Sequence, residues 1–247
     1  VRVKAGRQVI PGRHWTGCCG HCASPALCGQ GDVKAKSRAI GIFGGTFDPV
    51  HYGHLRAAVE AMEQLQLDDF RLLPAGTPPH RSQPHASAEH RLDMLQLALS
   101  PYPDLVLDDR EVRRDGPSYM VDTLAEIRDE AGDAPIILMI GQDAANALDQ
   151  WHEWRRLFEL THLVIMRRPE STYDYSPGLL EQVQPRLITD GQQLNGSPAG
   201  LILPLELTQL AISATDIRNR IRNGLSPRFL LPRPVIQYIR AHGLYRE

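Results

Sequence analysis

The sequence lacks any long apolar run and any excess of one charge. No uninterrupted apolar stretch approaches the roughly 20 residues that a bilayer-spanning helix needs. The 247 residues carry 27 basic and 29 acidic side chains, which gives a formal net charge of -2. Such a balance provides no general electrostatic attraction for a polyanion. We therefore expect neither a membrane nor a nucleic acid among the partners of this protein.

Cysteine is absent from most of the chain. Cys18, Cys19, Cys22 and Cys28 all lie near the N-terminus, and none occurs in residues 29–247. This distribution is typical of a protein of the reducing cytoplasm that does not depend on disulfides. We therefore predict a cytoplasmic location.

The first 37 residues differ in composition from the rest. They are rich in Gly, Arg, Pro and Cys, nearly free of acidic residues, and without helical or strand periodicity. No apolar segment typical of a secretory signal is present. We expect residues 1–37 to be a disordered or non-native N-terminal extension. Its C-x-x-C stretch, Cys19 to Cys22, could be a thiol redox motif or part of a zinc site. Against a redox motif, no strand precedes it, and against a zinc site, no second pair of ligands follows at a regular spacing.

From residue 38 onward, apolar runs alternate with helical patterns. This alternation is typical of βαβ units, so we predict an α/β fold for residues 38–247: a single domain with a doubly wound, Rossmann-like parallel sheet and helices on both faces. Ser87, Ser118 and Ser213 are candidate helix N-caps, and residues 170–200 are expected to be a mobile excursion. The predicted strands are 39–43, 70–74, 105–108, 135–141, 162–166 and 201–206, and the predicted helices are 54–67, 87–99, 118–130, 213–224 and 233–243.

The stretch IGIFGGTFDPVHYGHL combines a short strand, two glycines and two histidines three residues apart. Gly44 and Gly45 leave room for a phosphate to approach the backbone, and Thr46 adds a hydroxyl. The helix that follows offers free amides and a positive dipole end. His51 and His54 share one face of its first turn and could donate to one phosphate. A metal site is a weaker alternative, since no third candidate ligand lies at a sequence spacing typical of metal sites. We therefore predict no metal site.

The motif resembles that of the (H/T)-x-G-H nucleotidyltransferase superfamily, because Thr46, His51 and His54 match its spacing. The stretch ISATDIR, Ile212 to Arg218, is similar to the second signature of that superfamily, I-S-x-T-x-I-R. Together the motifs resemble the bacterial nicotinate-nucleotide adenylyltransferases over about residues 38–247. The intervening motifs are PPHR (78–81), PSYMVDTL (117–124), IGQD (140–143), WHEW (151–154) and RRP (167–169).

The resemblance implies that the adenylyl group of ATP is transferred to nicotinate mononucleotide. The products would be deamido-NAD and pyrophosphate, with Mg²⁺ on the phosphates. Such chemistry depends mainly on positioning and charge stabilisation. By the same resemblance His51, His54 and Arg218 would be catalytic.

The resemblance also assigns two binding regions. The ATP site would comprise Gly44, Gly45, Thr46, His51, His54, Gly141, Asp143, Ser213 and Arg218. The nicotinate mononucleotide site would comprise Arg81, Ser118, Tyr119, Met120, Trp151 and His152. Met120 and His152 depart from the family pattern, which usually has Thr and often Tyr there, and this leaves the strictness of acid over amide selection open.

Three other readings compete with this interpretation. Pantetheine-phosphate adenylyltransferases share the histidine motif but are typically shorter and lack PPHR and WHEW. Class I aminoacyl-tRNA synthetases would need a lysine-rich K-M-S-K-S-like loop, which is absent. A non-catalytic nucleotide-binding regulator would not need both histidines and Arg218. The sequence leaves the oligomeric state open, a homo-oligomer included.

Overall fold

The computed structural model describes residues 39–76, 83–167, 173–208 and 210–246. Residues 36–247 form one compact unit. The predicted extension, residues 1–37, lies outside the described residues, as does Arg81. No helix in the described part is long and apolar enough to cross a membrane.

The core of the unit is a six-stranded parallel sheet in the order β3-β2-β1-β4-β5-β6. Strand β1 pairs with β2 on one side and with β4 on the other, so the direction of winding reverses between β1 and β4. This order confirms the doubly wound prediction and places the switch point of the sheet there. The strands are β1 (Ile40–Gly45), β2 (Asp69–Pro74), β3 (Leu105–Leu107), β4 (Ile136–Gly141), β5 (His162–Arg167) and β6 (Ile202–Glu206).

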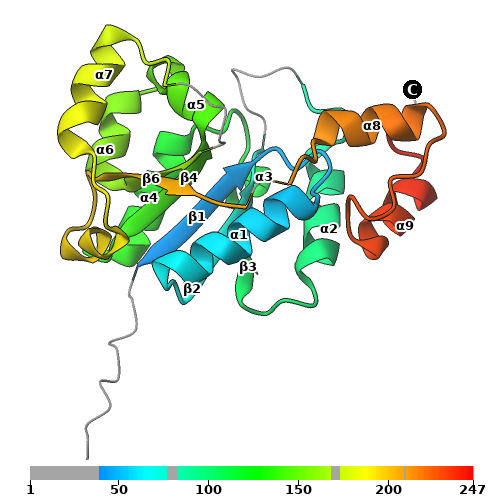
Figure 1. Cartoon of the computed structure of the whole chain (residues 1–247). Helices are drawn as coiled ribbons and strands as arrows, with labels where there is room; N and C mark the ends of the chain where they lie inside the picture. The colour runs from blue at the N-terminus through cyan, green and yellow to red at the C-terminus, as the bar shows by residue number, and fades with distance from the viewer. Residues whose placement is uncertain (1–38, 77–82, 168–172, 209, 247) are drawn as a thin grey trace, which may run out of the picture. The chain divides into compact units, whose positions relative to one another are not determined.

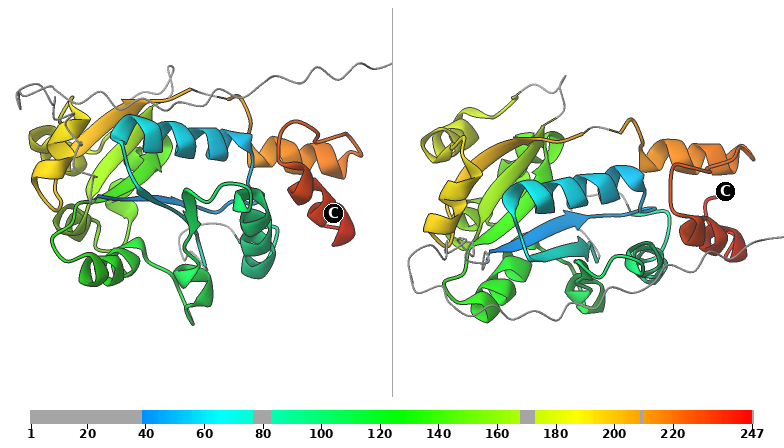
Figure 2. Two further views of the ribbon diagram at one scale, coloured as in Figure 1. Left: turned by 90° about the horizontal axis from the view of Figure 1, so that it is seen from below. Right: turned by 60° about the horizontal axis from the view of Figure 1, so that its bottom comes forward.

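Helices cover both faces of the sheet, as Figure 2 shows for α1 (Tyr52–Leu65) and α4 (Met120–Ala131) on opposite sides. Strand β4 is apolar on both faces because it is central: Ile137 and Met139 join the core under α1, and Leu138 joins the core under α4. The other helices of eight or more residues are α2 (Ala88–Leu99), α8 (Ala214–Arg222) and α9 (Arg233–Ala241).

Helices α8 and α9 lie beyond the end of the sheet to which β1 points (Figure 1). Ser213 caps α8 as predicted, since its hydroxyl accepts from the amide of Asp216 at 3.1 Å. Ser87 likewise caps α2 by accepting from the amide of His90 at 3.3 Å. The caps fix where these helices begin, and therefore which of their residues face the end of β1.

Two predictions are wrong. Ser118 does not cap α4; Tyr119 stands at the N-cap, and the Ser118 hydroxyl donates to the main-chain oxygen of Glu111 instead. The segment predicted to be mobile contains ordered structure after its undescribed residues. Helix α7 (Pro177–Val183) buries Leu179, and the 3₁₀ helix η4 (Gly191–Gly196) buries Leu194.

The sequence pattern also missed the short helices, whose one or two turns show no periodicity. They are α3 (Arg110–Arg113), α5 (Gln142–Asn146), η1 (Leu148–Gln150), η2 (Trp154–Arg156), α6 (Leu157–Leu160) and η3 (Gln184–Arg186).

Gly76, just after β2, gives a test of this packing. A Cβ atom there would collide with the main-chain oxygen of Glu111 and lie 2.6 Å from the Ser118 hydroxyl oxygen. We expect Gly76→Ala to lower the free energy of unfolding by at least about 3 kcal/mol, because a backbone oxygen cannot move aside. Gly178→Ala is the control, since no atom lies within 4 Å of its added methyl group and a helical alanine is favoured by about 0.5–1 kcal/mol. Equal denaturant midpoints for the two variants would contradict the packing argument.

Candidate active site

A cavity of about 550 Å³ opens at the carboxyl ends of β1 and β4, the switch point of the sheet. It brings together most of the residues that the sequence assigned to ATP. Gly44, Gly45 and Thr46 come from the end of β1 and the residue after it, His54 from α1, Gly141 from the end of β4, Asp143 from α5, and Arg218 from α8. Residues far apart in the chain therefore share one lining, as expected of a ligand site in an open α/β sheet.

The loop between β1 and α1 turns sharply beneath the cavity. Phe47 adopts a left-handed φ of 48°, and its buried ring lies where a side chain on Gly45 would stand, 2.9 Å from such a Cβ atom. A Cβ atom on Gly44 would lie 3.0 Å from the Met120 side chain. A side chain on Gly45 would therefore displace the Phe47 ring, and one on Gly44 would press on the Met120 side chain.

The two histidines form a stacked pair at the start of α1. Their ring centroids are 3.7 Å apart with an angle of 22° between the planes. His51 is the N-cap residue and not part of the first turn, and its main-chain amide donates to Nδ1 of His54 at 3.3 Å. Because Nδ1 of His54 is an acceptor, the neutral ring carries its proton on Nε2 and is a donor there. Gly53 is required between them, since a Cβ atom there would stand 3.0 Å from the His51 ring.

Both rings are neutral in the ligand-free protein. Burial lowers the pKa of His51 to about 4. Burial, and then the neighbouring His51, lower the pKa of His54 well below its usual range. Within the described part of the chain, Nδ1 of His51 is buried without a hydrogen-bond partner. The pair therefore offers neutral donors, and an anion bound against them would raise both pKa values.

Arg218 supplies the positive charge of the cavity. Its Nη1 donates to the main-chain oxygen of Asp48 at 2.7 Å, and its Nη2 donates to the hydroxyl of Thr215 at 3.2 Å. The first of these bonds holds the guanidinium against the loop that carries Gly44 and Gly45. Ser213 caps the helix that carries Arg218 but does not line the cavity, so its predicted contact with ATP remains a prediction.

The residues predicted to bind the acceptor lie at the same end of the sheet, but only one of them lines the cavity. Trp151 does so, half-buried. The rings of Tyr119 and His152 pack with centroids 4.3 Å apart, and Met120 covers Gly44. Tyr119, Met120, His152 and Ser118 are absent from the cavity lining, and Arg81 lies outside the described residues.

Sequence reasoning missed four residues that organise the site. Asp48 accepts hydrogen bonds from the amide of His85 and the hydroxyl of Tyr245. The guanidinium of Arg91, with 1% of the residue exposed, donates to the main-chain oxygens of Thr46 and Gly76. A charged residue within the buried stripe of α2 was a visible signal for Arg91. The contacts of Asp48 with His85 and Tyr245 gave no signal in the sequence, because they join residues that are 37 and 197 positions apart.

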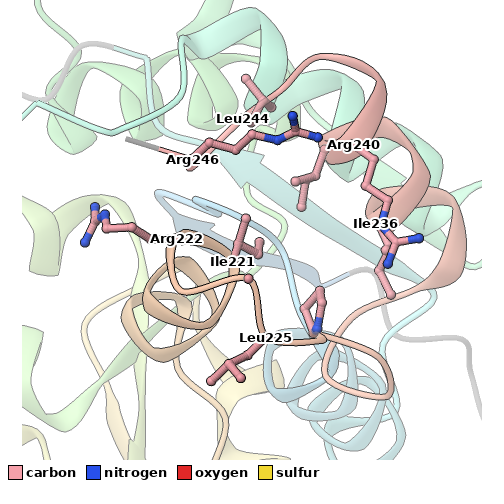
Figure 3. Close-up of a pocket in the computed structure, with 10 residues that line it drawn as sticks. Ile221, Arg222, Leu225, Ile236, Arg240, Leu244 and Arg246 are labelled. Carbon is pink, nitrogen blue, oxygen red and sulfur yellow. The ribbon is translucent and has the colours of Figure 1, made fainter.

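A second hollow of about 430 Å³ lies between α8 and α9 (Figure 3). Its floor is formed by apolar side chains such as Ile221 and Leu225, and Arg222 lies on the opposite side from Arg240 and Arg246. It contains no residue from the end of a strand and none of the predicted site residues. The cavity at the switch point is therefore the candidate active site.

No cluster of three or more His, Cys, Asp or Glu side chains capable of holding a metal ion occurs among the described residues. Two carboxylates line the cavity, Asp48 and Asp143. Three protein hydrogen bonds already occupy Asp48. This donor set suits a cation that arrives on substrate phosphates and keeps its water ligands, as Mg²⁺ commonly does.

The comparisons with known proteins agree with this geometry. Residues 42–220 match the family model described as cytidylyltransferase-like. The chain is 51% identical over 209 residues to a protein of Methylococcus capsulatus named "Probable nicotinate-nucleotide adenylyltransferase", which covers 84% of this chain and all of that protein. It is 47% identical to a Chromohalobacter salexigens protein of the same name, over 86% of this chain and 98% of the relative.

The fold is similar to that of a solved structure, the Plasmodium falciparum nicotinic acid mononucleotide adenylyltransferase complexed with NaAD. The TM-score is 0.64 at 16% identity, over 84% of this chain and 97% of that one.

The fold and the site define a nucleotidyltransferase with a doubly wound sheet. The chain belongs to the cytidylyltransferase-like family and, within it, to the nicotinate-nucleotide adenylyltransferases.

The depressed pKa of His51 predicts a pH effect on stability. In the folded protein His51 becomes protonated only near pH 4, whereas in the unfolded chain it becomes protonated near pH 6.5. The unfolded state thus binds more protons in this window, so stability falls as the pH falls from 6.5 to 4, by up to about 3 kcal/mol. Urea unfolding at pH 7 and pH 4.5 should show a smaller loss for His51→Gln than for the unsubstituted protein. Equal losses for the two proteins would contradict the depressed pKa.

Proposed function

We propose that this protein transfers the adenylyl group of ATP to nicotinate mononucleotide, with release of deamido-NAD and pyrophosphate. The observation that carries the proposal is the stacked pair of neutral histidines, of which His54 lines the cavity at the switch point together with Arg218, in a chain of this family. The mononucleotide phosphate oxygen attacks the α-phosphorus of ATP. The bond from that phosphorus to the bridging oxygen breaks, and the oxygen leaves with pyrophosphate.

No side chain needs to act as a nucleophile in this reaction. The Nε2–H of His54 is positioned to donate to a phosphate oxygen, and His51 supports it through the stack. Arg218 stabilises the charge that shifts onto the leaving pyrophosphate. We further propose that Gly44, Gly45 and Thr46 hold the phosphates, that Gly141 and Asp143 bind the adenosine ribose, and that Ser213 contributes at the start of α8. Mg²⁺ bound on the ATP phosphates would neutralise their charge.

The acceptor would lie between Trp151 and the start of α4. The Trp151 ring offers a face for the pyridine ring, and the first amides of α4 have no partners within their own helix. We propose that Ser118, Tyr119, Met120 and His152 shape this subsite and that Arg81 contributes to binding the mononucleotide phosphate. We further propose that the protein acts in the cytoplasm and has no nucleic-acid partner.

Removal of the His54 donor tests the catalytic assignment. We expect His54→Ala to leave the fold intact and to lower kcat by about 10²–10³, as loss of a preorganised donor does. His51→Ala should behave similarly. The matched control is His242→Ala, because His242 is exposed at the end of α9. Turnover is measured as pyrophosphate release, and a folded His54→Ala protein with near-normal kcat would overturn the assignment.

The choice of acceptor gives a second test. A carboxylate presents acceptors on both oxygens to the amides of α4, whereas a carboxamide turns an NH₂ group toward some of them. Each donor left unpaired costs about 1–3 kcal/mol, so two give a preference on the order of 10²–10⁴. We expect nicotinate mononucleotide to exceed nicotinamide mononucleotide at least about 10²-fold in kcat/KM at fixed ATP and Mg²⁺.

Phosphopantetheine serves as a third acceptor and should give no product. Equal rates with the acid and the amide would show that Met120 and His152 have remodelled the pocket.

A further inference from the structure

The loop between β1 and α1 is tied to the C-terminal end of the chain through one buried carboxylate. Asp48 lies in that loop with 5% of the residue exposed. We propose that Asp48 is a positioning residue for the adenylyl transfer, and that the Tyr245 hydroxyl holds its carboxylate away from Arg218, so that Arg218 stays available to phosphates. The inference rests on the proposed function.

Each oxygen of the carboxylate has its own donors. Oδ1 accepts from the Tyr245 hydroxyl at 2.7 Å and from the amide of Ala86 at 3.2 Å. Oδ2 accepts from the amide of His85 at 2.8 Å, and Nη1 of Arg218 stands 3.8 Å from it. A carboxylate has about four acceptor positions, and three are filled by these hydrogen bonds. Asp48 is therefore engaged by the protein itself and acts on the site through its neighbours.

Those neighbours form a large part of the cavity. The segment Gln83–His85 lines it, and its end is fixed by the two amides that donate to Asp48. Arg218 lines it as well and donates to the main-chain oxygen of Asp48 at 2.7 Å. One residue thus sets the position of a cavity wall and of the cavity's guanidinium.

The surroundings of Tyr245 keep its hydroxyl protonated, so that it remains a hydrogen-bond donor. Burial, and then the charge of Asp48, raise the pKa of Tyr245 well above its usual range, so the hydroxyl keeps its proton. Gly243 has φ of 65° and Tyr245 itself has φ of 63°, and the amide of Leu244 donates to the main-chain oxygen of Ile239. This turn after α9 directs the buried ring of Tyr245 toward the loop of Asp48.

The geometry indicates what the hydroxyl prevents. At 3.8 Å, the carboxylate and Nη1 of Arg218 are close but not hydrogen-bonded. Without the Tyr245 hydroxyl, Oδ1 loses its shortest bond and keeps only the one from the amide of Ala86 at 3.2 Å. The carboxylate, still held at Oδ2 by the amide of His85, can then shift toward the guanidinium. A closer ion pair would neutralise Arg218 and make it compete less well for phosphate. The expected result is weaker binding of pyrophosphate and ATP with the fold intact.

The substitution that tests this is Tyr245→Phe, which removes only the hydroxyl. Tyr238→Phe is a matched control, since Tyr238 in α9 donates to Oδ2 of Asp93 at 2.6 Å on an exposed part of the surface. We expect Tyr245→Phe to weaken inorganic pyrophosphate binding, measured by calorimetry, about tenfold and to lower kcat/KM for ATP by a similar factor. Tyr238→Phe should stay within about twofold of the unsubstituted protein in both. Normal pyrophosphate binding by Tyr245→Phe, or an equal loss in Tyr238→Phe, would overturn the proposal.

A double substitution separates positioning from general stability. If Tyr245 acts through the charge of Arg218, then Tyr245→Phe should cause no further loss of pyrophosphate affinity when Arg218→Gln is already present. Losses that multiply would overturn the proposal. Should Tyr245→Phe not fold, Asp48→Asn is measured in the same way. It removes the charge that would neutralise Arg218, so pyrophosphate should bind at least as tightly as to the unsubstituted protein, and a tenfold loss would refute the proposal. An unsubstituted protein that binds pyrophosphate but makes no deamido-NAD would contradict the proposed function alone and leave the binding comparison intact.

Discussion

The site depends on a guanidinium buried beneath it. Arg91 projects from α2 into the core and donates to the main-chain oxygens of Thr46 at 2.8 Å and of Gly76 at 3.0 Å. Burial of an arginine is costly unless its donors are satisfied, and burial lowers the pKa of Arg91 without making it neutral. Those two oxygens belong to the loops that follow β1 and β2. Neighbouring parallel strands bring the loops to the same edge of the sheet, and Arg91 joins them there.

The candidate active site next to these loops contains neutral hydrogen-bond donors and few charged side chains. The stacked histidines are held neutral by burial, so the ligand-free loop does not carry two adjacent positive charges. No lysine follows Lys36 in the sequence, so the cations of the folded unit are arginines. Arg218 presents a planar set of donors that suits phosphate oxygens. Among the described residues, Arg218 is the arginine that lines the cavity at the switch point, although the chain as a whole is close to neutral.

Asp48 extends this arrangement from the loop to the end of the chain. Its carboxylate is bound by donors at His85, Ala86 and Tyr245, which come from the segment before α2 and from the turn after α9. Helices α8 and α9 thus do more than cover the end of the sheet: one carries Arg218, and the other leads into Tyr245. The packing of the last residues therefore reaches the loop that lines the candidate active site.

The sequence by itself determined the elements whose signal is local. The continuous apolar runs predicted the central strands, because parallel strands are covered on both faces. Helical periodicity predicted α1, α2, α4, α8 and α9. The two glycines with His51 and His54 marked the loop that lines the candidate active site. Only the tertiary structure decided which side chains support that loop. Arg91, His85 and Tyr245 reach it across 45, 37 and 197 positions of the chain. Such hydrogen bonds exist only when the sheet order brings distant segments to one edge, and no local pattern in the chain encodes them.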